Sequence, residues 1–359
     1  MITVTKTFLP PLEEYCALIQ QIWERGQLTN NGPLVVALEE SLRQYLGVKH
    51  VLYVSNGTLA LQLAIKALGL QGDIITTPFS YVATTSSIVW EHCRPVFVDI
   101  DPRSLCLNPA LIEAAITPTT QAILATHVFG FPCAVEAIEQ LARRHKLRVI
   151  YDAAHAFGVQ HQGRSILQYG DISTLSFHAT KLFHTGEGGA VATNDDELAD
   201  KLAYMRNFGH KDTNEFIGLG INAKNTEMHA ALGLCVLPHL PALMQRRQEL
   251  TALYDQLLAP YAVQRLGLGA ASEHTNYSYY PVLLPSEAHL LAVMAALGQA
   301  DIHPRRYFYP ALTALPYVTA AAACPVATDV ASRVLCLPLH HDLVEADLRQ
   351  IVAIISRCL

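Results

Sequence analysis

Between residues 50 and 195, short apolar runs alternate with longer amphipathic segments. Runs rich in Val, Ile and Leu are typical of strands buried on both faces, as in a mostly parallel sheet covered by helices. Segments 59–69 and 134–145 have the spacing of amphipathic helices. This alternation predicts an α/β fold built on one large sheet. The predicted strands span residues 51–55, 73–77, 95–99, 121–126, 147–152, 172–177 and 189–193.

A second, smaller domain is predicted at the C-terminal end of the chain. The length of 359 residues favours two domains over one. Segment 224–258 has the pattern of a long helix that Pro238 and Pro241 interrupt, because proline lacks the backbone donor that a helix needs. We therefore expect a large domain over residues 1–240 and a small domain over residues 241–359.

Composition excludes several kinds of partner. The net charge is −6 and no run of Lys or Arg occurs, so we expect neither nucleic acid nor an anionic membrane as a partner. The Ala-rich stretches are too short to span a bilayer, and the start lacks the pattern of a signal peptide. Eight cysteines without a C-x-x-C pair favour free thiols. These features predict a soluble cytoplasmic protein, in which local donors must bind any anionic substrate.

Polar groups follow three of the predicted strands, at the ends where ligands collect in open α/β sheets. After strand 51–55, Gly57 allows close approach of the backbone to a ligand, and Thr58 can cap the next helix. The amides and the positive dipole at that helix start would bind a phosphate-sized anion. The alternative for this stretch alone is an ordinary capped helix start.

Asp152 ends the very apolar strand 147–152. A buried carboxylate is costly unless it meets a cation or several donors, and a protonated pyridine nitrogen is such a cation. His155, three residues later, would then donate to or accept from a ring oxygen. Taken alone, Asp152 is equally explained as a helix cap and His155 as a core histidine.

Lys181 lies five residues after Ser176, which stands at the end of strand 172–177. A lysine amine that is buried near a cationic ring loses basicity and becomes a nucleophile and a base. Ser176 can donate to a phosphate, and the glycines that follow permit a tight turn against a ligand. A phosphate cradle, a partner for a pyridinium and a reactive lysine together indicate one cofactor, pyridoxal 5′-phosphate. The glycines are Gly186, Gly188 and Gly189.

A metal site is the competing interpretation of the histidines in this region. His178 and His184 are six residues apart, and no cysteine or carboxylate accompanies them at a familiar ligand spacing. We therefore expect no metal. The four histidines concerned are His127, His155, His178 and His184.

At these residues the chain resembles the DegT/DnrJ/EryC1/StrS family of sugar aminotransferases over nearly its whole length. The motifs NGTLAL, TTPFSYVAT, PVFVDID, DAAHAFG, SFHATK and EGGA occur in family order. The resemblance implies the fold of type I pyridoxal phosphate enzymes, similar to aspartate aminotransferase. That fold has a large domain with a mixed, mostly parallel seven-stranded sheet and a smaller C-terminal α+β domain.

The resemblance also implies a role for each matching residue. Lys181 would bind the cofactor covalently, Asp152 would pair with the pyridine nitrogen, Tyr81 would stack on the ring, and His155 would contact the ring oxygen. Gly57, Thr58 and Ser176 would bind the phosphate. Asn222 would reach the phosphate from a partner subunit, which implies a homodimer with composite active sites.

A narrower resemblance concerns the segments TFLPPLEEY, LTNNGP, RNFGHKDTNEFIGLGINAKN and PRRYFYPAL. They look like those of family members that use L-glutamate to aminate carbon 4 of dTDP-4-dehydro-6-deoxy-D-glucose, giving dTDP-4-amino-4,6-dideoxy-D-glucose. Such products are expected to be built into surface glycans such as the O-antigen of lipopolysaccharide. The expected substrate-binding residues are Asn30, Asn31, His184, Glu187, Arg206, Asn207, His210, Lys211, Arg305, Arg306, Tyr307 and Tyr309.

Several alternatives stay open at this point. Each expected substrate contact is equally explained as a surface charge or a packing aromatic. The acceptor could be another sugar nucleotide, such as a GDP-linked or 3-keto sugar, or a cyclitol. Dehydratases of the family replace the lysine by histidine, so Lys181 argues against dehydration. A cofactor-binding regulatory protein without turnover is the alternative from another class.

Overall fold

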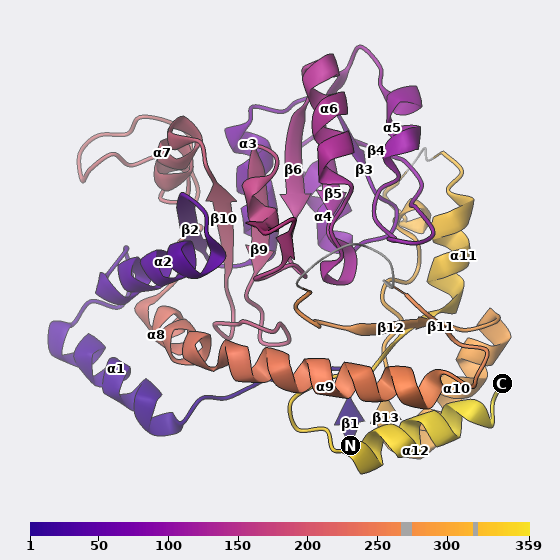
Figure 1. Cartoon of the computed structure of the whole chain (residues 1–359). Coiled ribbons are helices and arrows are strands. Elements are labelled where there is room, and N and C mark those ends of the chain that lie inside the picture. The colour runs from indigo at the N-terminus through magenta and orange to yellow at the C-terminus, as the bar shows by residue number, and fades with distance from the viewer. Residues whose placement is uncertain (267–274, 319–321) are drawn as a thin grey trace.

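The computed structural model describes residues 1–266, 275–318 and 322–359. Its centre is a seven-stranded sheet in which β10 runs antiparallel to both neighbours and the other neighbouring pairs are parallel (Figure 1). All seven predicted strands are confirmed, each within two residues at either end. In spatial order they are β2 (His50–Val54), β10 (Gly189–Thr193), β9 (Ile172–Ser176), β6 (Arg148–Asp152), β5 (Thr120–Thr126), β3 (Asp73–Thr76) and β4 (Arg94–Phe97).

Helices cover both faces of this sheet, because side chains along each strand point alternately to its two sides. Val51 and Tyr53 of β2 belong to one hydrophobic cluster, and Leu52 and Val54 belong to another. The predicted α/β fold is therefore confirmed. The first cluster includes residues of α2 (Pro33–Leu46), α5 (Pro109–Ala115) and α6 (Val135–His145), and the second includes residues of α3 (Gly57–Ala67), α4 (Val82–Trp90) and α7 (Asp196–Met205).

The C-terminal part forms a smaller antiparallel sheet of β11 (Gln264–Arg265), β12 (Tyr280–Leu283) and β14 (Val334–Leu337). Buried residues of α9 (Leu240–Leu258), α10 (Glu287–Gln299) and α12 (Glu345–Ser356) form a third cluster with it, and α11 (Pro325–Arg333) joins the first cluster. The division into residues 1–240 and 241–359 remains a proposal.

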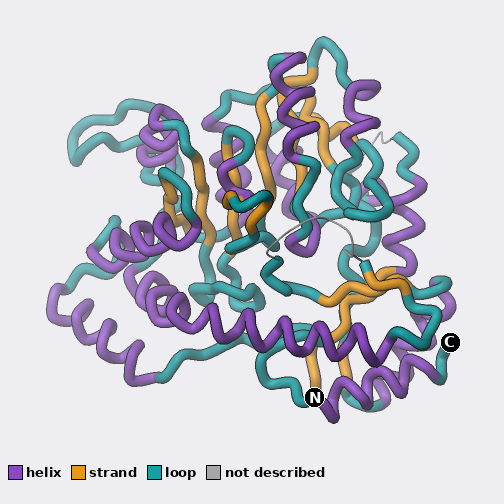
Figure 2. The backbone as a smooth tube through the Cα atoms, viewed as in Figure 1, coloured by secondary structure: helices purple, strands orange, loops and turns teal. Residues whose placement is uncertain are grey.

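A long helical run connects the two parts. The run, which Figure 2 shows, consists of α8 (Glu227–Val236), a 3₁₀ turn over residues 237–239 and α9 (Leu240–Leu258). The predicted interruption is confirmed at Pro238, whereas Pro241 lies in the first turn of α9. Helix α8 packs closely on the loop between β9 and β10, since a Cβ at Gly233 would lie 2.8 Å from a side-chain carbon of Thr185.

The remaining elements are short or lie at the N-terminal end. Strands β7 (Gln160–His161) and β8 (Arg164–Ser165) pair with each other, and α1 is Leu12–Arg25. Strand β1 (Ile2–Thr3) pairs in parallel with β13 (Ile302–His303), so the N-terminal end of the chain lies beside the C-terminal part (Figure 1).

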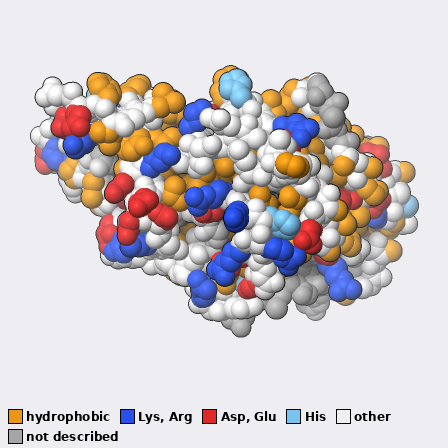
Figure 3. Space-filling model, turned by 90° about the horizontal axis from the view of Figure 1, so that it is seen from above, with side chains coloured by type: hydrophobic (Ala, Val, Ile, Leu, Met, Phe, Trp, Pro, Cys, Tyr) orange, Lys and Arg blue, Asp and Glu red, His pale blue; other side chains and the backbone are white. Residues whose placement is uncertain are grey.

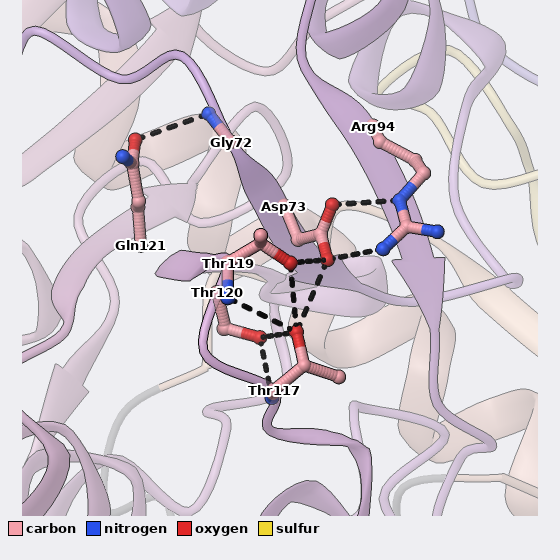
Figure 4. Close-up of polar contacts among 7 residues, drawn as sticks. All are labelled: Gly72, Asp73, Arg94, Thr117, Thr119, Thr120 and Gln121. Atoms are coloured by element: carbon pink, nitrogen blue, oxygen red, sulfur yellow. Dashed lines mark hydrogen bonds and ion pairs between the residues drawn. The ribbon is translucent and has the colours of Figure 1, made fainter.

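A polar network fixes the amino ends of β3, β4 and β5 (Figure 4). The buried carboxylate of Asp73 forms an ion pair with Arg94 and accepts a hydrogen bond of 2.7 Å from the Thr119 hydroxyl. The hydrogen bonds from Arg94 are the main cause that holds the pKa of Asp73 below its usual value. The network lies at the edge of the sheet opposite to the carboxyl ends of these strands, and so leaves that second edge free for a ligand.

The surface carries charges of both signs, and the cysteines are unpaired. On the face in Figure 3, Lys and Arg side chains of the described residues stand in small groups among acidic and apolar ones. All eight cysteines are free. Within the described ranges, no helix combines the length and the apolar character that crossing a membrane requires.

Candidate active site

The carboxyl ends of several strands converge on one cleft. Strand register places Asp152 beside Thr126 on one side and Thr174 on the other, and places Ser176 beside Gly189. The cleft has a volume of about 240 Å³. Ten of the residues expected from the sequence line it, namely Gly57, Thr58, Tyr81, Asp152, His155, Ser176, Lys181, Glu187, Arg305 and Tyr307.

One wall of the cleft is the amino end of α3. Asn56 caps this helix, with its side-chain oxygen accepting from the Leu59 amide at 2.8 Å. The prediction that Thr58 is the cap was wrong, because Asn56 stands at the last non-helical position, and the exposed Thr58 hydroxyl is left to face the cleft. A Cβ at Gly57 would lie 2.9 Å from that of Ser176, so only glycine brings these amides beside the Ser176 hydroxyl. Amides, dipole and hydroxyls together form an anion cradle.

Asp152 is buried at the floor of the cleft, with 5% of its surface exposed. Its carboxylate accepts from the Thr84 hydroxyl at 2.7 Å and from the Ala154 amide at 3.1 Å. Burial raises the pKa of Asp152, while these two hydrogen bonds and the charge of Lys181 act in the opposite direction. Residues 153–158 form turns, so Asp152 does not cap a helix. Among the described residues the carboxylate forms no ion pair at salt-bridge distance, which leaves it able to receive a cationic ligand atom.

His155 is packed among aromatic rings beside Asp152. Its Nδ1 accepts from the Phe129 amide at 3.3 Å, and its ring centroid lies 4.6 Å from that of Tyr279. Burial, with the charge of Lys181, lowers the pKa of His155 well below its usual value. A neutral ring whose Nδ1 is an acceptor carries its proton on Nε2. The Nδ1 of His155 is therefore used inside the protein, and its Nε2 is left as a hydrogen-bond donor.

Lys181 projects into the cleft from the loop that joins β9 to β10. The loop is closed by hydrogen bonds from the Thr185 amide to the Phe177 carbonyl, 2.9 Å, and from the Phe177 amide to the Gly188 carbonyl, 2.8 Å. Burial lowers the pKa of Lys181 to about 8; Arg305 also lowers it, and Asp152 acts against both. The cleft therefore holds a lysine whose pKa lies well below the usual value of its amine.

The mouth of the cleft is aromatic and basic. The Arg305 guanidinium lies 4.4 Å from the centroid of the Tyr307 ring, and both side chains line the cleft. Arg306 forms an ion pair with Glu287 at 2.7 Å and lines a neighbouring cavity, not the cleft. Tyr309 lines a neighbouring cavity of about 220 Å³, which shares Tyr81, Arg305 and Tyr307 with the cleft.

Other expected substrate residues lie away from this cleft. A second cavity of about 500 Å³ is lined by Asn30, Asn31, Arg206, Asn207, His210 and Lys211. Arg206 is ion-paired with Glu39 there, and Lys211 is paired with Glu215 at 2.9 Å. Asn222 is exposed and forms an isolated antiparallel bridge with Asn207.

His184 does not line the cleft, contrary to the role expected for it. Its side chain is 1% exposed, and its Nε2 lies 2.7 Å from the carbonyl oxygen of Phe8. A carbonyl only accepts, so Nε2 carries the proton, and Nδ1 accepts from the Gly186 amide at 3.3 Å. Both ring nitrogens are thus used inside the protein, which leaves none for a substrate.

Sequence reasoning missed a chain of hydroxyls behind Asp152. Thr126 donates to Ser80 at 3.1 Å, Ser80 lies 2.7 Å from Thr84, and Thr84 donates to Asp152. All three side chains are buried. The signal for two of them was present, because Ser80 and Thr84 are four residues apart at the start of α4 and so share one face of the turn.

The arrangement of the side chains does not support a metal centre. Within residues 1–266, 275–318 and 322–359, no group of three or more His, Cys, Asp or Glu side chains is arranged to hold a metal ion. His127, one of the histidines considered, is fully buried, and its Nδ1 accepts from the Cys133 amide at 3.0 Å.

Comparison with known proteins agrees with this geometry. The dTDP-4-amino-4,6-dideoxy-D-glucose transaminase of Shigella dysenteriae is 43% identical over 359 residues, covering 99% of this chain and 98% of that protein. The Escherichia coli protein of the same name is 38% identical over 352 residues, covering 96% and 95%. The solved structure of DesI in the presence of its TDP-sugar product superimposes with a TM-score of 0.95 at 33% identity, covering 99% of this chain and 92% of that one.

The family assignment rests on nearly the whole length of the chain. The match to the DegT/DnrJ/EryC1/StrS aminotransferase family extends over residues 12–356, and so includes both the strand-end residues and the C-terminal part. The chain belongs to the DegT/DnrJ/EryC1/StrS aminotransferase family.

Proposed function

We propose that the cleft binds pyridoxal 5′-phosphate and that the protein transfers the amino group of L-glutamate to dTDP-4-dehydro-6-deoxy-D-glucose. The products are dTDP-4-amino-4,6-dideoxy-D-glucose and 2-oxoglutarate. The observation that carries the proposal is Lys181, with its lowered pKa, in the same cleft as the buried Asp152. The names of the two transaminases described above support the choice of substrate.

Three features of the cleft fit three parts of the cofactor. The start of α3 with Gly57 and Ser176 suits the phosphate, because amides and hydroxyls meet there without an intervening side chain. Asp152 suits the protonated ring nitrogen, because burial makes an unpaired carboxylate costly. Lys181 suits the aldehyde. Tyr81, which is 53% exposed beside these groups, suits the face of the ring.

The division of chemical work follows from these positions. When bound, pyridoxal 5′-phosphate supplies an electron sink for the carbon that carries the amino group. Lys181 would take the α-proton of glutamate at its Nζ and deliver it to the cofactor and not back to glutamate, and a pKa of about 8 leaves roughly a tenth of the amine neutral at pH 7. Thr84 and the Ala154 amide donate to Asp152 and so favour its charged form, which would hold the ring nitrogen protonated.

One cleft serves both half-reactions, so glutamate must leave as 2-oxoglutarate before the sugar nucleotide enters. Both substrates are anionic, and Arg305 is the guanidinium that lines the cleft while Arg306 is held by Glu287. We assign Arg305 and Tyr307 to substrate binding at the mouth of the cleft. Ping-pong kinetics follow from this order of events.

We also infer a homodimer with composite active sites. Five apolar side chains of segment 208–221 are exposed in a single protomer, close in sequence to the exposed Asn222. Such a group of apolar side chains is typical of a surface that another subunit covers. They are Phe208 at 48%, Phe216 at 64%, Ile217 at 49%, Leu219 at 71% and Ile221 at 41%. The residues of the second cavity, Asn30, Asn31, Arg206, His210 and Lys211, would then lie near the partner's cleft.

The eight free cysteines support a reducing compartment, and we propose the cytoplasm as the location. Transfer to a different sugar nucleotide is the second candidate function, since other relatives carry the names of enzymes for GDP- and UDP-linked sugars.

The acceptor is tested by product analysis. Purified protein with pyridoxal 5′-phosphate and L-glutamate is offered dTDP- and GDP-linked 3-keto and 4-keto sugars, and the products are identified by mass spectrometry. We expect an amino sugar only from dTDP-4-dehydro-6-deoxy-D-glucose, with one 2-oxoglutarate for each. The Lys181→Ala variant forms no amino sugar. The Lys66→Ala variant, which changes a lysine outside the cleft, still forms it. Equal or faster amination of a GDP-linked sugar would replace the proposed substrate, and no 2-oxoglutarate with any acceptor would contradict the reaction.

The acidity of Lys181 is tested in cofactor-free protein. The rate at which its amine reacts with acetic anhydride is followed against pH by peptide mass spectrometry. We expect a midpoint near pH 8, because burial disfavours the charged amine. Arg305→Gln raises the midpoint because it removes a like charge, whereas Arg306→Gln leaves it unchanged because Glu287 holds Arg306. A midpoint above about pH 10, the ordinary range of a lysine amine, contradicts the site geometry.

The composite site is tested with mixed dimers. As homodimers, the Lys181→Ala variant is inactive and the Asn222→Ala variant is weakly active if both residues serve one site. A mixed dimer of the two variants contains one site with both changes and one unaltered site, provided that Asn222 acts on the partner's cleft. We therefore expect activity to reappear when differently tagged variants are co-expressed and the mixed dimer is isolated. A mixed dimer as inactive as its parents, or a protein that stays monomeric, defeats the dimer proposal.

A further inference from the structure

The N-terminal segment crosses the molecule from the C-terminal part to the loop of Lys181. Residues 2–9, here called the N-terminal strap, begin with β1, which pairs with β13. The Leu339 amide then donates to the Val4 carbonyl at 3.0 Å, and Lys6 forms an ion pair with Asp342. The first half of the strap is thus attached to the C-terminal part.

The second half of the strap is attached to the loop on both sides of Lys181. The Thr7 hydroxyl donates to the carbonyl of Ala179, two residues before Lys181, at 2.9 Å. The His184 ring, three residues after Lys181, donates to the Phe8 carbonyl at 2.7 Å. The Phe8 ring packs 5.1 Å from the His239 ring and 5.4 Å from the His341 ring, measured between centroids. These contacts anchor Phe8 to the long helical run and to the C-terminal part together.

The strap adds to a loop that the buried Leu182 and Phe183 side chains fix on the C-terminal side of Lys181. Residues 178–188 contain no helix or strand, and the Lys181 amide bonds only within the loop, to the His178 carbonyl at 2.8 Å. An amine that must move a proton between fixed atoms loses rate steeply when it is misplaced by about 1 Å. His184 is buried where it meets the strap, so water does not readily replace its hydrogen bond.

We propose that Thr7 and His184 are positioning residues for Lys181, and that the N-terminal strap holds the loop through these two hydrogen bonds. The inference rests on the proposed function for the role of Lys181. It gives His184 a purpose that does not involve the substrate, and it makes the geometry of Lys181 depend on the C-terminal part of the chain.

The first test is structural and needs no turnover. Hydrogen exchange of peptides within residues 177–188 is measured in the full-length protein, with and without added pyridoxal 5′-phosphate. We expect faster exchange in Thr7→Val and His184→Leu, because each removes one hydrogen bond to the strap. Thr3→Val is the matched control, because the Thr3 hydroxyl donates to Thr5 within the strap and not to the loop. Unchanged exchange in both variants, at unchanged thermal stability, overturns the proposal even if the protein proves inactive as a transaminase.

The second test separates positioning from simple stability. We expect Thr7→Val and His184→Leu to lower kcat by about tenfold or more, with KM for glutamate changed by less than about twofold. His184→Gln restores most of the rate, because the Gln amide nitrogen can reach the place of Nε2, and Thr7→Ser does the same for the hydroxyl. Loss of rate without rescue by either conservative variant, or loss through KM alone, contradicts a positioning role. A wild-type protein without transaminase activity contradicts the proposed function instead. The hydrogen-exchange result still tests whether the N-terminal strap holds the loop.

Discussion

The opposed charges of Asp152 and Lys181 are the interaction on which the site depends. Burial alone favours a neutral carboxyl and a neutral amine, and each charge counters this effect on the other. Hydrogen bonds from Thr84 and the Ala154 amide favour the charged carboxylate, and burial lowers the pKa of the Lys181 amine. A cationic ring between them would complete the charge balance. The surrounding structure can be understood as the means of holding these two groups in place.

The topology of the sheet holds most of the site in place. Parallel strands bring their carboxyl ends to one edge, so Asp152, Ser176 and the start of α3 meet although they lie far apart in the sequence. At the other edge, the Asp73 network fixes β3, β4 and β5 against one another (Figure 4). Lys181 is the exception, because it lies on a loop and not on a strand. Its position depends on α8, which packs on Thr185, and on the N-terminal strap.

The sequence predicted the parts of the site that follow from strand periodicity. Apolar runs located all seven strands, and their ends located Asp152, Ser176 and the anion cradle. It could not predict contacts between distant segments. Thr84 reaches Asp152 over 68 positions, and His184 meets Phe8 over 176, so neither contact leaves a local pattern. The cap of α3 was misplaced from Asn56 to Thr58 because both residue types favour that position and their spacing of two does not decide between them.

Peptide mapping after borohydride reduction shows whether Lys181 binds the cofactor. Borohydride fixes any bond between a lysine amine and the aldehyde of pyridoxal 5′-phosphate, and mass spectrometry then locates the modified residue. We expect one phosphopyridoxyl group for each chain, on the peptide that contains Lys181. A group on another lysine, or an unmodified Lys181 in protein saturated with the cofactor, would contradict it.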